Sequence, residues 1–176
     1  MKVLSIIKPN IVLFVGDISD GSVKIIKKIN EIKIPTFVIL GNHDRGKDST
    51  GETLSKQIRV LGEKYCAWDL KVFNNQINLL SARPCSSGGG YYLSKEVKGV
   101  YGPITEQDSI NKIIKCSEKT VEDIPLIIMS HAGPSGLGSE PTSICGKDWK
   151  LPSLDWEIEI CLLLSLKYKR EEKLIL

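Results

Sequence analysis

The chain is poor in histidine, and its cysteines lack the number and spacing that are typical of disulfide-bonded proteins. Among 176 residues there are only two histidines, His43 and His131, so no site can use more than two imidazole ligands. The five cysteines are odd in number, widely spread and without a CxxC pair. This distribution argues against a disulfide framework and favours reduced thiols, so we expect a cytoplasmic protein.

Long apolar runs and concentrated charge are also missing. No apolar run approaches the length of a membrane span, and the segment Met1–Lys8 is too short and too interrupted for a signal peptide. The net charge is only +3, and the lysines are scattered without interleaved aromatic residues, so nothing indicates nucleic-acid binding. The length and a hydrophobic content of 41% fit one soluble domain with a real core.

Three apolar runs each lead into a short polar loop. The runs 11–15, 36–40 and 126–129 are followed by Gly16-Asp17-Ile18-Ser19-Asp20, by Gly41-Asn42-His43-Asp44 and by Ser130-His131-Ala132-Gly133. Open α/β sheets place their ligands just past strand ends. We therefore expect Asp17, Asn42 and His131 to converge.

The hydrophobic periodicity predicts an α/β fold. Residues 11–40 form one strand-helix-strand unit, with a helix over 22–32 and parallel strands. Further helices are predicted over 52–65 and 105–118, the second with Thr105 and Asp108 as capping residues. A hairpin is predicted about 74–76, between strands at 71–73 and 77–80.

The residue types in these loops suit metal chemistry. Carboxylate, amide and imidazole bind borderline ions such as Mn, Fe or Zn, and two such ions can support an in-line displacement at phosphorus. Each residue also has a simpler interpretation: Asp17 as a turn cap, Asn42 as a turn residue, and His131 as a hydrogen-bonded strand-end histidine. The joint pattern favours the metal site. Arg45 is either a phosphate clamp or a solvated loop charge.

In order and character, these motifs resemble those of the calcineurin-like metallophosphoesterase superfamily. The matching segments are Val15-Gly16-Asp17 with Asp20, Leu40-Gly41-Asn42-His43-Asp44 and Ser130-His131-Ala132-Gly133-Pro134. They resemble most closely a branch of predicted phosphoesterases from cyanobacteria and plastid-bearing organisms. The resemblance implies a four-layer α-β-β-α sandwich that hydrolyses a phosphate mono- or diester at a dinuclear Mn, Fe or Zn site.

The resemblance also assigns roles to the loop residues. It implies that Asp17 bridges both metals and that Asn42 and His131 bind the second one. His43, paired with Asp44, would contact the phosphate or protonate the leaving group. The expected partner is a phosphate-ester small molecule or a phosphorylated substrate. No membrane association is expected.

Two motifs of this family are not found in the chain: an Asp-x-His before Gly16 and a Gly-His-x-His after His131. We therefore expect a sandwich that is incomplete at both ends, impaired activity, and one bound ion or none. Cys145, Asp148 or Asp155 would have to replace the missing ligands, but their spacing repeats no known ligand pattern. The expected domain is 1–156, followed by an atypical tail, 157–176, that leaves the neighbouring sheet edge unpaired.

Two other functions remain open at this stage. The chain could be a catalytically inactive fragment that keeps the fold and acts as a binding or scaffold protein. It could also be a serine hydrolase using Ser135 and His131, although the G-x-S-x-G spacing of a nucleophile elbow is missing.

Overall fold

The computed structural model describes residues 2–88, 90–133, 142–143 and 174–175. Five residues named above (Pro134, Ser135, Cys145, Asp148 and Asp155) and most of the tail lie outside these ranges. In chain order, the elements are α1 (Lys2–Ile7), β1 (Val12–Val15), α2 (Val23–Asn30), β2 (Thr36–Ile39), α3 (Glu52–Leu61), the 3-10 turn η1 (Gly62–Lys64), β3 (Asp69–Phe73), β4 (Ile77–Ser81), α4 (Lys95–Tyr101), α5 (Glu106–Ser117), β5 (Leu126–Met129) and β6 (Leu174–Ile175). None of the helices described has the length and apolar character needed to cross a membrane.

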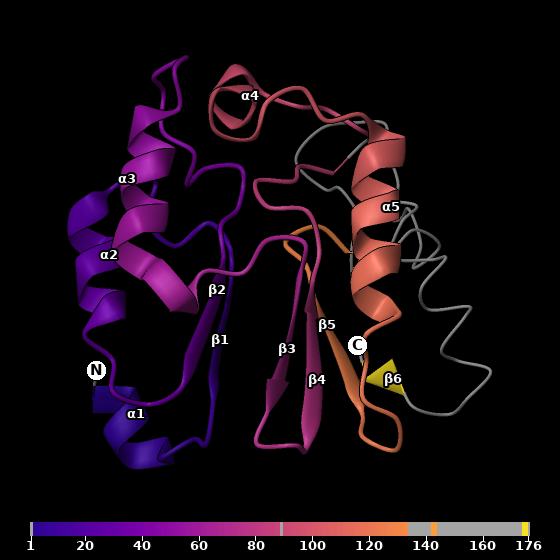
Figure 1. Ribbon diagram of the computed structural model, residues 1–176. Coiled ribbons are helices and arrows are strands. Elements are labelled where there is room, and N and C mark those ends of the chain that lie inside the picture. The colour runs from indigo at the N-terminus through magenta and orange to yellow at the C-terminus, as the bar shows by residue number, and fades with distance from the viewer. Residues whose placement is uncertain (1, 89, 134–141, 144–173, 176) are drawn as a thin grey trace.

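The strands form two sheets (Figure 1). In the first sheet β1 and β2 are parallel, with Val12 opposite Thr36, as predicted for a strand-helix-strand unit. The second sheet has the order β3-β4-β5-β6, in which β3 and β4 are antiparallel and β4 and β5 are parallel. The predicted hairpin is present, and Asn74 and Asn75 take φ values of 50° and 55° at its turn.

The outer edge of β5 is paired by β6. Leu174 lies opposite Leu126, and Ile175 lies opposite Ile127, both in parallel register. The expectation of an unpaired edge was therefore wrong at these positions. A strand of two residues is too short to show a period of two, so the sequence could not reveal it.

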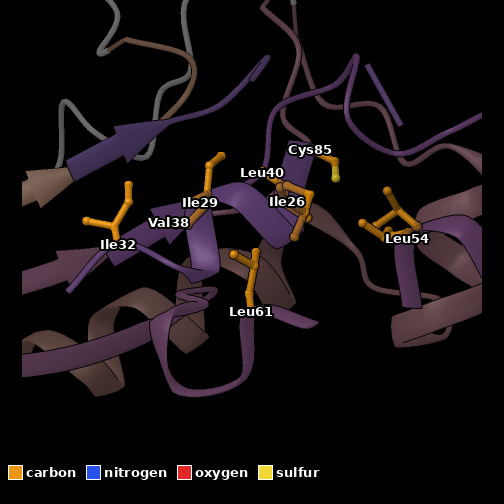
Figure 2. Packing of buried hydrophobic residues seen from close by; sticks show 9 residues of the cluster. Ile26, Ile29, Ile32, Val38, Leu40, Leu54, Leu61 and Cys85 are labelled. Atoms are coloured by element: carbon orange, nitrogen blue, oxygen red, sulfur yellow. The ribbon is translucent and has the colours of Figure 1, made fainter. Parts of the chain in front are cut away.

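The strand β2 separates two cores, because its successive side chains point to opposite faces. Val38 and the following Leu40 pack with residues of α2 and α3, whereas Ile39 belongs to a cluster between the two sheets. Figure 2 shows the helix-side cluster, which contains Ile26, Ile29, Ile32, Leu54, Leu61 and Cys85 in addition to Val38 and Leu40. Both faces of β2 are thus covered, which explains its uninterrupted apolar sequence.

The strands β4 and β5 alternate in the same way. Leu79 and Met129 join the cluster between the sheets, while Leu80 and Leu126 pack with Ile113 of α5. The order of layers is therefore α2 and α3, the β1-β2 sheet, the β3-β6 sheet, and α5 (Figure 1). This is the predicted four-layer α/β arrangement.

Local signals explain where the helices begin and end. Thr105 and Asp108 form the predicted capping box at the start of α5. Helix α3 ends at Leu61, earlier than predicted, because Gly62 takes a φ of 54° and the chain continues as a 3-10 turn. The short helix α4 was not predicted, although Ser94 caps it by accepting a hydrogen bond from the Val97 amide.

Candidate active site

Three loops that follow β1, β2 and β5 meet at one edge of the sandwich. The His131 Nε2 atom lies 3.3 Å from Asp17 Oδ1 and 3.0 Å from Asn42 Oδ1. Asp17 and Asn42 follow strands of the first sheet, whereas His131 follows a strand of the second. The structure thus brings together the three residues that the sequence singled out, and it does so across the junction of the two sheets.

Two glycines permit this close approach. Gly16 and Asp17 take positive φ values of 98° and 52°, so the chain turns sharply directly after β1. A Cβ atom at Gly16 would overlap the His131 ring, and one at Gly41 would overlap the Asp17 carboxylate. Any side chain at these positions would force the loops apart. Asp17 takes a left-handed conformation, which aspartate tolerates better than most residues.

The surroundings of His131 determine which ring nitrogen is free. Nδ1 lies 2.8 Å from the carbonyl oxygen of Val15, which can only accept, so Nδ1 carries the proton and donates it. Nε2 then faces the oxygens of Asp17 and Asn42, which are also acceptors. In this arrangement three acceptor atoms lie close together, which suits a metal ion among them.

The donor set fits one divalent ion. Ligand atoms that each lie about 2.1 Å from one ion are themselves about 3 Å apart, which matches the two separations measured here. The set comprises one carboxylate, one amide oxygen and one imidazole. Within the described ranges, no group of three or more His, Cys, Asp or Glu residues is arranged to hold a metal. The amide of Asn42 is therefore needed to complete even one three-donor site.

The buried Asp44 joins the loop after β1 to the loop after β2. Its Oδ1 accepts hydrogen bonds from the amides of Ile18, at 2.9 Å, and Ser19, at 2.6 Å, and its Oδ2 accepts one from the amide of Gly41, at 2.9 Å. The prediction paired Asp44 with the His43 ring, but in the described structure the carboxylate bonds to these two loops instead. The position of Asp44, fully buried, suits a positioning role.

Helix α3 contributes a second buried polar residue that the sequence analysis missed. Gln57 Nε2 donates to the carbonyl oxygen of Asp44 at 2.5 Å, and Gln57 Oε1 lies 2.6 Å from Ser19 Oγ. Gln57 is fully buried on the same helix face as Leu54 and Leu61. The sequence does contain a signal for this residue: Gln57 lies on the apolar face of the helix, and a buried amide needs hydrogen-bond partners.

His43 lies beside the converging residues. Its backbone amide donates to Asp17 Oδ1 at 2.9 Å, and the residue is exposed. Together with Asn42 it borders a half-open pocket of about 160 Å³. The complete lining of the pocket is Asp20, Asn42, His43, Arg45, Gly46 and Lys47.

Two cationic side chains line this pocket. Arg45 is held in place, because its Nη1 donates to the carbonyl oxygen of Asn42 at 2.7 Å and its Nε lies 3.4 Å from Glu96 Oε2 on α4. It is therefore not a freely solvated loop charge. Lys47 was missed, although two basic residues separated by one position in a loop beside Asn42 were visible in the sequence.

The comparisons with known proteins are consistent with this geometry. The family model for calcineurin-like phosphoesterases matches residues 1–162, a range that includes every residue of the site described above. This match does not test the branch suggested by the motifs. No curated protein and no solved structure matches the chain. Because the family model covers most of its length, the chain belongs to the calcineurin-like phosphoesterase family.

Proposed function

We propose that this protein hydrolyses a phosphate mono- or diester with the help of a divalent transition-metal ion. The observation that carries the proposal is the convergence of Asp17, Asn42 and His131, in which Nε2 of His131 lies 3.0 Å from Asn42 Oδ1 and 3.3 Å from Asp17 Oδ1. Such a cluster of acceptors beside a pocket with two cations suits a metal and a phosphate together.

Each residue has a distinct task in this proposal. Asp17, Asn42 and His131 would hold an ion such as Mn, Fe or Zn, and Asp17 has a second oxygen with which to bridge to another ion. When bound, such ions activate water and polarise the phosphoryl group. The Val15 carbonyl keeps the proton on His131 Nδ1, and so keeps Nε2 available.

The pocket residues would act on the ester itself. Arg45 and Lys47 attract and orient the anionic phosphate. His43 lies at the border of the pocket, where its imidazole can contact a phosphate oxygen or give a proton to the leaving oxygen. Asp44 acts on none of these atoms, since its carboxylate is occupied in holding the two loops together.

We further propose that the described residues hold one ion and that hydrolysis is slow. A dinuclear mechanism needs ligands for both ions. The described part of the site provides three donor side chains, enough for a single incomplete coordination shell. Manganese binding to the purified chain should therefore saturate at one equivalent. Two equivalents would contradict the single-ion proposal.

The function is tested by metal binding and hydrolysis in the same set of variants. With Mn²⁺ added, the chain should hydrolyse nitrophenyl phosphate or its bis-ester, and a chelator should abolish the activity. His43→Ala should keep manganese binding but lose about 100-fold in rate, as expected for the loss of a general acid. Asp17→Asn and His131→Ala should lose both properties. Glu63→Gln, an exposed change in η1, is the matched control and should lose neither.

The same set separates the competing functions. An inactive binding protein would retain manganese or phosphate binding and show no chelator-sensitive turnover at any substrate concentration. A serine hydrolase would be chelator-resistant and would need Ser135, which lies outside the described residues. Both ring nitrogens of His131 already face other groups, which favours the metal-dependent reaction.

A further inference from the structure

The loop that follows β4 contains a buried arginine that forms no close ion pair within the described residues, although the more distant Glu106 partly offsets its charge. Arg83 is only 2% exposed, and no ion pair of the described residues involves it. Burial lowers the pKa of its guanidinium group, the sign of a cation removed from water without full compensation. Buried charges in proteins are normally paired, so this arrangement calls for an anion.

The hydrogen bonds of Arg83 show which part of the group is available. Nη1 donates to the carbonyl oxygen of Tyr92 at 2.8 Å, and the guanidinium carbon lies 4.6 Å from the centre of the Tyr91 ring. Nε and Nη2 are buried and have no partner within the described structure. These two nitrogens form one edge of the planar group, the edge that binds carboxylate or phosphate through two parallel hydrogen bonds.

A second unpartnered donor lies three residues further along the same loop. The hydroxyl of Ser86 is buried and has no partner within the described structure. Unsatisfied buried donors are rare and costly, each about 1–3 kcal/mol. Three of them in one loop of four residues are better explained by a ligand that accepts hydrogen bonds than by three independent losses.

This loop adjoins the candidate active site. Because β4 is parallel to β5, the chain leaves β4 at the same edge at which His131 follows β5. The amide of Cys85 donates to the carbonyl oxygen of Leu40, directly before Gly41. The Cys85 thiol is close enough to Asp44, Asp17 and Arg83 for their charges to act on its pKa, which the two carboxylates raise and the guanidinium lowers.

We infer that the Nε–Nη2 edge of Arg83, together with the Ser86 hydroxyl, is a binding site for an oxyanion, a phosphate or carboxylate group. The stacked Tyr91 ring and the Tyr92 carbonyl fix the plane of the guanidinium, so the edge is preorganised for two oxygens of one group. This site does not use Asp17, Asn42 or His131 and does not depend on a bound metal.

The test observes Arg83 directly in the unmodified, full chain. In ¹⁵N-labelled protein with a chelator present, the Arg83 Nε–H signal, assigned through its bonds to the Arg83 backbone, is followed while inorganic phosphate or acetate is added. We expect a saturable shift with a dissociation constant in the millimolar range. No shift in a folded protein, or an equal shift with chloride, would overturn the inference.

Variants then define the groups that bind the anion. Arg83→Lys keeps the charge but not the two-nitrogen edge, and should bind phosphate about tenfold more weakly. Ser86→Ala should weaken binding a few-fold, and unchanged affinity would remove Ser86 from the site. Arg45→Gln removes a cation from the neighbouring pocket and should leave the shift of the Arg83 signal unchanged. If it abolished that shift, the anion would be bound at the pocket instead.

A kinetic comparison identifies the source of the oxyanion. If the site binds a second acidic group of the substrate, Arg83→Lys will raise KM for carboxyphenyl phosphate and not for phenyl phosphate. If it binds a separate small anion, the two esters will respond alike. Loss of all hydrolysis would count against the proposed function but not against this site, because the signal of the Arg83 side chain is measured without turnover.

Discussion

At the scale of single residues, Asp44 shows how one buried carboxylate can join two loops. It accepts hydrogen bonds from backbone amides in two loops, and these loops present Asp17 and Asn42. Asparagine in its place would point an NH₂ group toward some of these backbone N–H donors, because Asn has an NH₂ group where Asp has an oxygen.

We predict that Asp44→Asn lowers the free energy of unfolding by about 2–3 kcal/mol, because buried amides lose a charged acceptor. Asp20→Asn is the matched control. Asp20 is exposed, and an asparagine tolerates its left-handed φ of 46°, so the change should stay within about 0.5 kcal/mol. Urea melts measure both variants. A stable Asp44→Asn protein that has lost only activity would instead support the original pairing of Asp44 with His43.

Two buried thiols give the protein a pH-dependent stability. Burial raises the pKa of Cys85 to about 12 and that of Cys66 to about 11. An exposed thiol in the unfolded chain titrates near the ordinary value of 9.0. Between these values the unfolded state has released protons that the folded state still holds, so the free energy of unfolding falls as the pH rises.

We predict that raising the pH from 8 to 10 costs the wild type about 1 kcal/mol more than it costs Cys85→Ala, in which this thiol is removed. Urea melts at the two pH values measure this difference. Because each protein is compared with itself at two pH values, the constant cost of the cavity in Cys85→Ala cancels. Equal losses would show that the Cys85 thiol is not protected from ionisation in the folded state.

At the scale of elements, the capping box of α5 is a local device that can be tested by itself. The Thr105 hydroxyl accepts from the Asp108 amide, and the Asp108 carboxylate accepts from the Thr105 amide. We predict that Thr105→Ala costs about 1 kcal/mol, whereas Thr105→Ser, which retains the hydroxyl, costs much less. Thermal or urea melts measure both. Equal destabilisation by the two changes would mean that the methyl group, and not the cap, is responsible.

Elements with strong local signals could be predicted from the sequence, and elements without them could not. The parallel β1-α2-β2 unit, the hairpin turn at Asn74 and Asn75, and the Thr105 cap each depend on neighbouring residues. Helix α4 is short and its Ser94 cap was overlooked, whereas the two-residue β6 is defined only by its pairing with β5.

The same distinction applies to the site. Asp17, Asn42 and His131 were found because each follows a strand, so topology alone brings them together. The partners of Asp44 could not be predicted, because Ser19 and Gln57 are distant from it in sequence and meet it only in the folded chain. The unpartnered Nε and Nη2 atoms of Arg83 could not be predicted either, since burial and hydrogen bonding are properties of the folded chain.

At the scale of the whole molecule, β4 offers two adjacent leucines that belong to different cores. Leu79 packs between the sheets, and Leu80 packs under α5, each almost completely buried. We predict that alanine at either position costs about 2–5 kcal/mol. Only Leu79→Ala should also weaken manganese binding, because it loosens the packing between the sheet that supplies Asp17 and the sheet that supplies His131.

Manganese titrations of the two variants, under conditions in which both are folded, measure this difference. Leu80→Ala is the control for general destabilisation. Equal affinities in the two variants would show that the distance between the sheets does not control the site.

The position of His131 on one sheet and of Asp17 and Asn42 on the other has a thermodynamic consequence. An ion held by all three cross-links the halves of the sandwich, so its occupancy and the docking of the sheets become one linked equilibrium. An ion at a hundred times its dissociation constant would then add about 2.7 kcal/mol to the stability of the docked state. Separation of the sheets would pull the three ligands apart, so a bound ion would make that separation less frequent.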